Sequence, residues 1–184
     1  MGARPDYPGN VIIRRWTEIP DKRQLTPEID AIFFEASNTK EFAGEGERAA
    51  FRERWLGKYL ANEPQFAYVA FAGGDGRAAG YLVGSVSEPV GLEAFANAAW
   101  EYPAHLHVNL APQFRNRGIG ARLIDNFAVD ALRAGAPGMH VVTSADSRNV
   151  RFYTRNGFTE VARAAVDGPE LVFLGRRLDA TETA

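Results

Sequence analysis

Short apolar, β-branched runs alternate with segments of helical periodicity, and this alternation most constrains the fold of the chain. The strand-like runs lie at residues 11–17, 66–72, 77–87, 105–110, 139–143, 158–164 and 171–178. Helical spacing occupies residues 26–37, 47–61, 118–133 and 147–155, and a further short helix is expected within 89–99. Strands and helices mixed in this order predict an α/β or α+β domain with about seven strands, rather than a helical bundle or a β-sandwich.

Capping and turn residues predict where several of these elements begin and end. Thr26, followed by Pro27 at the first helical position, is expected to cap the first helix. The run Gly73–Gly76 supplies the positive φ angles that a tight hairpin needs, and Asn156 followed by Gly157 suits a left-handed helix end. Two helices each show one apolar face, which consists of Phe51, Trp55, Leu56, Tyr59 and Leu60 in the first and of Ile119, Leu123, Phe127 and Ala131 in the second.

The composition is that of one ordinary domain. With 184 residues, 46% of them hydrophobic, the chain can form one substantial core, and no internal repeat or linker divides it. We therefore expect a single domain over residues 1–184, with residues 179–184 as a frayed tail. Cysteine is absent, which excludes a disulfide framework, a thiolate metal site and a cysteine nucleophile. No metal site is expected.

Charge and hydropathy limit the classes of partner that the chain is expected to bind. The formal net charge is -2, from 21 basic and 23 acidic residues, so no global basic field favours a nucleic acid or an anionic membrane. The first twenty residues lack the apolar stretch of a signal peptide, and no uncharged apolar run is long enough to cross a bilayer. We expect a cytoplasmic protein, either a monomer or a homodimer.

The segment 110–120, LAPQFRNRGIG, joins a strand to an amphipathic helix and carries the most specific chemical signal. Arg115 and Arg117 stand where the partial positive charge of a helix start normally attracts acidic residues, so their position is favourable only beside an anion. Gly118 and Gly120 would let the backbone approach that anion closely. A Walker loop and the third glycine of a dinucleotide fingerprint are both missing. The alternative is a polar loop that leads into a glycine-tolerant helix.

Two ordered motifs resemble those of one enzyme family. Residues 115–120, RNRGIG, resemble the [QR]xxGx[GA] motif of the GNAT N-acetyltransferases, and residues 146–158, DSRNVRFYTRNGF, resemble the NxxAxxxYxxxGF segment that follows it. The resemblance is close over about 66–164 and extends to the other residues by element order. It implies a GNAT fold with a splayed mixed sheet, acetyl-CoA as the acyl donor, and transfer of the acetyl group to an amine of a small molecule or protein.

The resemblance also implies roles for individual residues. Leu110 would offer backbone groups to the pantetheine arm, and Tyr153 would protonate the departing thiolate, although a tyrosine that only packs on its helix would look the same. Asp146 stands where the family usually has Asn and can accept hydrogen bonds but not donate them. Asn149 either contacts the cofactor or caps its helix. The pyrophosphate would be held by Arg115, Asn116, Arg117, Gly118, Ile119, Gly120 and Ala121.

The general base is left open by the resemblance. Some family members carry a strand Glu at about the position of Leu106, which His105 and His107 flank here. Histidine has a suitable pKa for deprotonating an amine, so His107 or His105 is the candidate base. The alternative is that both are ordinary hydrogen-bonded histidines.

A narrower resemblance suggests a different function. Residues 102–107 (YPAHLH), 151–154 (RFYT) and 174–178 (LGRRL) are similar to the acetyltransferase-like domain of O-GlcNAc hydrolases, a domain regarded as lacking catalysis. The alternative function is therefore a non-catalytic acetyl-CoA-binding or interaction module. In the GNAT family the acceptor is chosen by the first two helices, here within 26–64, whose acidic and aromatic residues suit either a cationic amine or an ordinary amphipathic helix.

Overall fold

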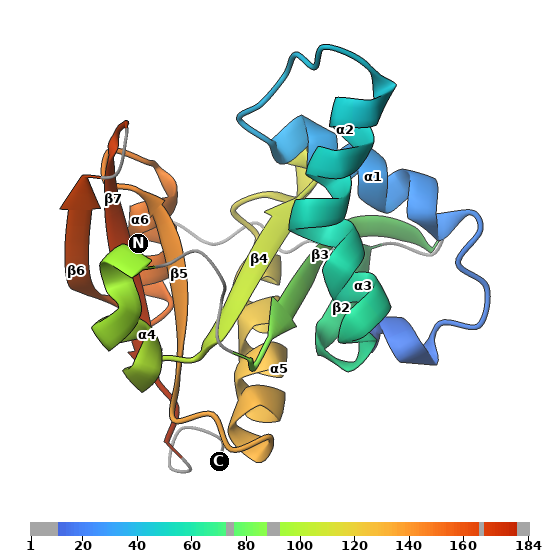
Figure 1. The fold of residues 1–184 in the computed structure, drawn as a ribbon. Helices are drawn as coiled ribbons and strands as arrows, with labels where there is room; N and C mark the ends of the chain where they lie inside the picture. Colours follow the sequence, from blue (N-terminus) through green and yellow to red (C-terminus); the bar gives the residue numbers. More distant parts are fainter. Residues whose placement is uncertain (1–10, 73–75, 88–92, 166–167, 180–184) are drawn as a thin grey trace, which may run out of the picture.

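A computed structural model describes residues 11–72, 76–87, 93–165 and 168–179. In this part of the chain one sheet has the strand order β1-β2-β3-β4-β5-β7-β6, and only the β4–β5 pair is parallel (Figure 1). The strands are β1 (Ile12–Arg15), β2 (Ala67–Ala72), β3 (Arg77–Ser85), β4 (Ala104–Leu110), β5 (Gly138–Ser144), β6 (Thr159–Ala165) and β7 (Glu170–Arg177). The α-helices are α1 (Leu25–Ala36), α2 (Glu45–Arg52), α3 (Lys58–Asn62), α4 (Ala96–Glu101), α5 (Ile119–Arg133) and α6 (Asn149–Arg155). This mixed sheet flanked by helices confirms the predicted α/β class.

The sheet opens between its two parallel strands. β4 and β5 pair only at Ala104↔Met139 and His105↔His140, after which the strands diverge (Figure 1). The amide of Ala111 donates to the carbonyl of Ala79 on the β3 side, at 3.0 Å. Backbone groups alternate in direction along a strand, so those of Leu106, Val108 and Leu110 point into the opening. Beyond His105 the far end of β4 therefore presents, on its β5 side, main-chain donors and acceptors that β5 does not pair.

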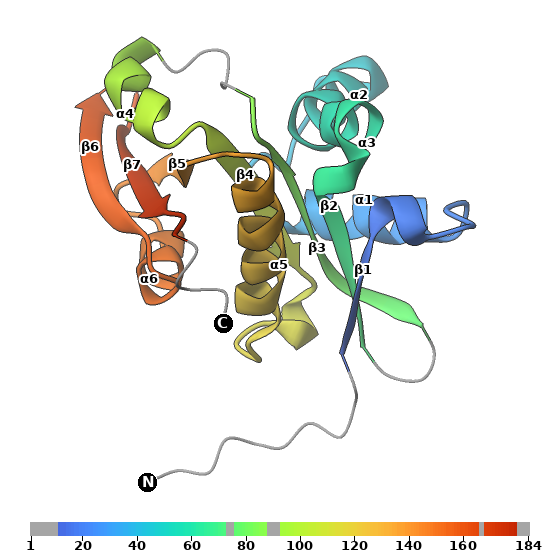
Figure 2. The same cartoon turned by 90° about the horizontal axis from the view of Figure 1, so that it is seen from below.

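Helices cover the two faces of the sheet differently (Figure 2). On one face α5 buries its predicted stripe of Ile119, Leu123, Phe127 and Ala131, each at most 2% exposed, against β2, β3 and β4. On the other face α1 and α3 pack over β3. Because side chains alternate along β4, Leu106 joins the α5 core, whereas His105 and His107 face the helices α1 to α3.

The predicted helix over 47–61 is present, but it contains an irregular turn. Between α2 and α3 the residues Glu53–Gly57 form a π-helical turn, whose wider winding shifts the faces that follow it. Leu56 and Tyr59 are buried as predicted, whereas Trp55 is 38% exposed. The sequence pattern was therefore wrong for Trp55, because an α-helical period was extended through a π turn.

Several predicted ends need correction. The first helix begins at Leu25, and Thr26 lies inside it, where its hydroxyl donates to the carbonyl of Lys22 instead of capping the helix. The first strand ends at Arg15, because Trp16–Glu18 turn into a 3-10 helix. At the end of α6 the prediction is confirmed, since Gly157 has φ +81°. Gly76 has the positive φ expected of the hairpin, whereas residues 73–75 and 180–184 lie outside the described residues.

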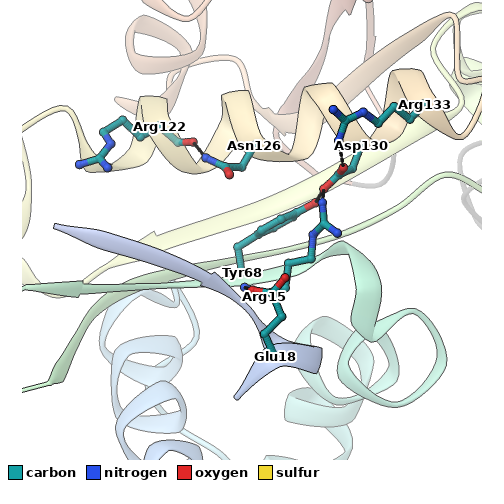
Figure 3. A network of polar contacts seen from close by, with 7 residues as sticks. All are labelled: Arg15, Glu18, Tyr68, Arg122, Asn126, Asp130 and Arg133. Carbon is teal, nitrogen blue, oxygen red and sulfur yellow. Dashed lines mark hydrogen bonds and ion pairs between the residues drawn. The ribbon is translucent and has the colours of Figure 1, made fainter. Parts of the chain in front are cut away.

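A polar network joins the first two strands to α5 (Figure 3). The Tyr68 hydroxyl on β2 donates to Asp130 at 2.5 Å, and Arg15 on β1 forms an ion pair with the same carboxylate. Arg133 contacts the other oxygen of Asp130 at 3.4 Å. The Asp130 side chain is 12% exposed, so its charge depends on these donors. No helix of the described residues is long and apolar enough to cross a membrane.

Candidate functional site

The loop between β4 and α5 forms a concave stretch of backbone that ends at an open helix start. Asn116 and Gly118 both have positive φ, at +61° and +77°, and Gly118 is the N-cap of α5. No side chain caps this helix, and its first turn contains no acidic residue. The first N–H groups of a helix lack intrahelical acceptors, so those of α5 remain available to an anion.

The two glycines of the loop, Gly118 and Gly120, are needed for different structural reasons. A Cβ at Gly118 would meet no atom within 4 Å, so this glycine is required by its positive φ and leaves open space before the helix. A Cβ at Gly120 would lie 2.9 Å from the ring of Phe152 on α6 and 3.6 Å from Leu110. Gly120 therefore lets α5, α6 and the end of β4 meet. The second sequence motif is brought beside the first by this contact.

The other residues predicted to hold the pyrophosphate differ in the groups that they can offer to a ligand. Ile119 is 2% exposed in the core, so only its backbone can reach a ligand, and Ala121 is half-buried. Asn116 and Arg117 are exposed, and the Arg117 guanidinium lies 5.9 Å from the centre of the Phe114 ring.

Arg115 has partners that the sequence did not reveal. Its Nε donates to the carbonyl of Leu110 at 3.1 Å, and its guanidinium forms an ion pair with Glu35 near the end of α1. Both side chains of the pair are more than 40% exposed. In this structure Arg115 therefore links the loop to α1 and occupies a carbonyl that points into the opening. The like-charge penalty expected at the helix start is offset by Glu35.

Tyr153 lies on α6, on the β5 side of the opening. It is 8% exposed, and its ring packs against Phe152 and Phe158 at centroid distances of 5.1 and 5.4 Å. Burial raises the pKa of the Tyr153 hydroxyl well above its ordinary value, so the group keeps its proton at neutral pH. Within the described residues no side chain or carbonyl accepts that proton. The group is thus a protonated donor without a competing acceptor.

The remaining motif residues are at the start of α6. Asp146 is exposed in the turn that follows β5, and Asn149 is the first residue of the helix. The hydroxyl of Ser147 accepts the amide hydrogen of Asn149 at 3.2 Å, and the Asn149 side chain makes no capping bond. The capping alternative for Asn149 is therefore wrong, and contact with a cofactor stays a prediction.

All three histidines of the chain gather at the point where β4 and β5 part. The Tyr59 hydroxyl of α3 lies 3.1 Å from Nε2 of His107 and 3.2 Å from Nε2 of His105. The rings of His105 and His140 are 5.6 Å apart, and Nδ1 of His140 lies 2.5 Å from the Tyr102 carbonyl. The predicted base thus belongs to a hydrogen-bonded cluster.

Burial keeps these histidines neutral. Desolvation lowers the pKa of His107 to about 3, with smaller contributions from His105, Lys58 and His140. It also lowers the pKa of His105 and of His140 to about 4 in each case. Neutral imidazoles carry a lone pair that can accept a proton, although a low pKa makes each a weak base.

Trp55 borders the same cluster from the helical layer. Its ring stands edge-on to His107 at 5.4 Å and is partly open to solvent because of the π turn. Sequence reasoning placed Trp55 and Tyr59 on an acceptor-side helix but could not connect either of them with His107. The described residues contain no group of three His, Asp or Glu side chains that could hold a metal ion.

Comparisons with known proteins agree with this geometry. The sequence profile of the Acetyltransferase (GNAT) domain matches residues 64–160, just over half of the chain. SsHAT has a similar structure, with a TM-score of 0.69 and 24% identity over 92% of this chain and 98% of that protein. An N-acetyltransferase from Staphylococcus aureus Mu50 follows with a TM-score of 0.62 and 19% identity over 92% of this chain and 99% of its own.

A third structure, yncA from Salmonella typhimurium, was solved with its cofactor acetyl-CoA. It has a TM-score of 0.58 and 20% identity over 92% of this chain and 95% of that one. At these identities the structures establish a shared fold, and the profile match adds the family. The splayed seven-stranded sheet and the RNRGIG loop thus have one common explanation: this chain belongs to the GNAT acetyltransferase family.

Proposed function

We propose that this protein is an acetyl-CoA-dependent N-acetyltransferase that acts on an amine of a small molecule or protein. One observation carries the proposal: beyond His105 the β5-facing backbone of β4 leaves its ladder with β5, and it leads directly to the uncapped, acid-free start of α5. The first feature suits the amides of a pantetheine arm, and the second suits a pyrophosphate. The acetyl-CoA bound by the similar yncA protein is consistent with this choice of donor.

In this proposal the loop and α6 bind the donor together. The backbone of residues 115–121 receives the pyrophosphate, with Arg115 and Arg117 as cationic side chains beside it. The backbone of Leu110 pairs with pantetheine, and Asp146 and Asn149 border the donor from the start of α6. Because Arg115 is held by Glu35 and by the Leu110 carbonyl, its side chain exchanges at least one of these partners for phosphate.

The chemistry would be divided between two residues on opposite sides of the opening. Acetyl-CoA supplies the acetyl group as a thioester. His107 takes a proton from the ammonium form of the acceptor, and the neutral amine nitrogen then forms a bond to the acetyl carbon as the carbon–sulfur bond breaks. Tyr153, still protonated because burial raises its pKa, gives its proton to the departing sulfur, and the proton that the new amide nitrogen loses restores the tyrosine hydroxyl.

A non-catalytic acetyl-CoA-binding module is the second candidate function. It is favoured by one observation, the pKa of His107 near 3, because so weak a base removes a proton from an amine poorly. The same fold would then bind the donor without turnover. The cytoplasmic location and the monomeric or homodimeric state remain predictions from the sequence.

Two measurements test the proposal. Calorimetry with acetyl-CoA, CoA and ATP should show binding of both CoA compounds at one site and no comparable binding of ATP. A thiol-release assay with a library of amines should then show CoA release that falls in Tyr153→Phe. Tyr81→Phe serves as the control, because Tyr81 is a buried β3 tyrosine whose hydroxyl accepts only from Asn109 among the described residues. Binding without release for every amine would favour the non-catalytic module.

A further inference from the structure

The Tyr59 hydroxyl is in contact with two histidine nitrogens and has one proton to give. Nε2 of His107 lies 3.1 Å from the hydroxyl oxygen, and Nε2 of His105 lies 3.2 Å from it. A hydroxyl donates one hydrogen bond and can accept others. If both contacts are hydrogen bonds, one Nε2 accepts from Tyr59 and the other must carry a hydrogen that it donates to the oxygen. The two neutral histidines are therefore opposite tautomers.

The surroundings of His105 indicate which histidine accepts the Tyr59 hydrogen and which one donates to the Tyr59 oxygen. In the part of the chain that the structure describes, Nδ1 of His105 is the one buried side-chain nitrogen or oxygen without a hydrogen bond of good geometry. The Pro103 carbonyl is nevertheless near enough to raise the pKa of this histidine. Nε2 is engaged with Tyr59, so Nδ1 is the nitrogen left to meet this carbonyl; a bare lone pair there is unfavourable, whereas an N–H is attracted to the oxygen. His105 thus carries its hydrogen on Nδ1, and its Nε2 accepts from Tyr59.

The tautomer of His105 also determines the tautomer of His107, because both histidines contact the Tyr59 hydroxyl. The Tyr59 proton is committed to His105, so the oxygen can only accept from His107, which must hold its hydrogen on Nε2. The lone pair of His107 is then on Nδ1. This atom is not among the fully buried atoms that lack a partner, and no described residue bonds to it, so it is at least partly uncovered in an otherwise half-buried ring. Nδ1 is therefore the His107 nitrogen that could accept a proton from an amine.

We propose that Tyr59 is a positioning residue that fixes the tautomer of His107 and leaves Nδ1 as the atom that accepts the amine proton. This inference rests on the proposed acetyltransferase function. A proton taken at Nδ1 makes His107 a cation whose Nε2–H remains bonded to Tyr59, so the same contact also holds the imidazolium in place. The titratable groups that surround this contact are His105 on β4, His140 on β5, Lys58 on α3 and Glu63, which acts on Tyr59.

The tautomers can be measured directly. Nitrogen-15 NMR of histidine-labelled protein at neutral pH should show His105 protonated at Nδ1 and His107 at Nε2, with the His107 Nε2–H proton slow to exchange. In Tyr59→Phe, which keeps the ring and its packing, that proton should exchange quickly and the Nδ1–H form of His107 should become detectable. Tyr81→Phe is the matched control, because it removes a buried hydroxyl from the same side of the sheet without touching a histidine.

Kinetics provide the second readout. Tyr59→Phe should lower kcat for amine acetylation by about tenfold or more while the dissociation constant for acetyl-CoA stays unchanged. Equal tautomers for His105 and His107 in the wild type, or spectra and kcat that do not change in Tyr59→Phe, would overturn the inference. A wild type that acetylates no amine would refute the proposed function instead, and the imidazole spectra would still decide the role of Tyr59.

Discussion

The ion pair between Arg115 and Glu35 allows a test of whether Arg115 binds phosphate, because each side chain of the pair can be substituted by itself. Both groups are more than 40% exposed, so the pair itself is worth roughly 0.2 to 1 kcal/mol. The bond from Arg115 Nε to the Leu110 carbonyl adds on the order of 0.5 kcal/mol at this exposed position. Without ligand, Arg115→Gln should therefore lower the free energy of unfolding by about 1 kcal/mol, a fall in Tm of about 2 to 4 °C.

Acetyl-CoA should distinguish the two partners. At a ligand concentration of about one hundred times Kd, the wild type gains about 2.7 kcal/mol of stability. Glu35→Gln breaks the same ion pair but removes no phosphate ligand, so it should keep this gain or exceed it, because Arg115 is released. Arg115→Gln should lose much of the gain, because a cationic contact to phosphate disappears.

Thermal melts of the three proteins at low salt, with and without acetyl-CoA, provide the assay. The expected pattern is a somewhat larger loss of stability in Arg115→Gln than in Glu35→Gln in the absence of ligand, and a smaller ligand-induced shift in Arg115→Gln. Equal ligand-induced shifts in Arg115→Gln, Glu35→Gln and the wild type would show that Arg115 is structural. The assignment of its side chain to the pyrophosphate would then be wrong.

Three further predictions concern the loop, the polar network and the histidines. Gly118→Asp should weaken acetyl-CoA binding at least about tenfold in calorimetry, because a carboxylate would stand before the anion site, while the positive φ lowers apo stability by no more than about 2 kcal/mol; unchanged affinity would contradict the predicted pyrophosphate site. Asp130→Asn should lower the urea unfolding free energy by about 2 kcal/mol and Tyr68→Phe by about 1 to 2 kcal/mol, since both break a bond to a nearly buried carboxylate; losses below about 0.5 kcal/mol would show that the network is loose. Burial depresses the pKa values of His107, His105 and His140 below the unfolded value, so stability should fall as the pH drops from about 6.5 toward 4, by about 1 to 2 kcal/mol per histidine at pH 5. Equal unfolding free energies at pH 7 and pH 5 would refute that burial.

Local patterns in the sequence were sufficient for most of the elements. The four-residue repeat from Ile119 to Ala131 predicted a buried helical stripe, because residues at that spacing share one helix face. Gly157 predicted a left-handed helix end for a similarly local reason. Where prediction failed, the local signal was ambiguous: Thr26 resembles a cap, but the preceding residues already allow the helix to begin at Leu25.

The candidate site was only partly predictable. The motif at 115–120 indicated the GNAT family, which the family profile confirms, and its loop ends at an uncapped helix start. The pyrophosphate-binding role of this loop stays a prediction. The motif could not show that Gly120 packs against Phe152, since the packing of α6 on α5 is a tertiary contact. It also could not show that Glu35 neutralises Arg115, because the two residues are 80 positions apart in the chain.

The sequence by itself determined the α/β class and the order of strands and helices, because these depend on neighbours within a few residues. It also indicated residues 115–120 as a candidate anion-binding loop, whereas the candidate acid Tyr153 and the candidate base His107 came from the resemblance to the GNAT family and stay predictions. The tertiary structure alone decided where β4 and β5 separate, that Trp55 turns toward solvent, and that Tyr59 bridges His105 and His107 across 46 and 48 positions of chain. The physical reason is that a π turn and the register of a parallel strand pair set the rotation and height of these side chains. Neither leaves a periodic signal in the amino-acid sequence.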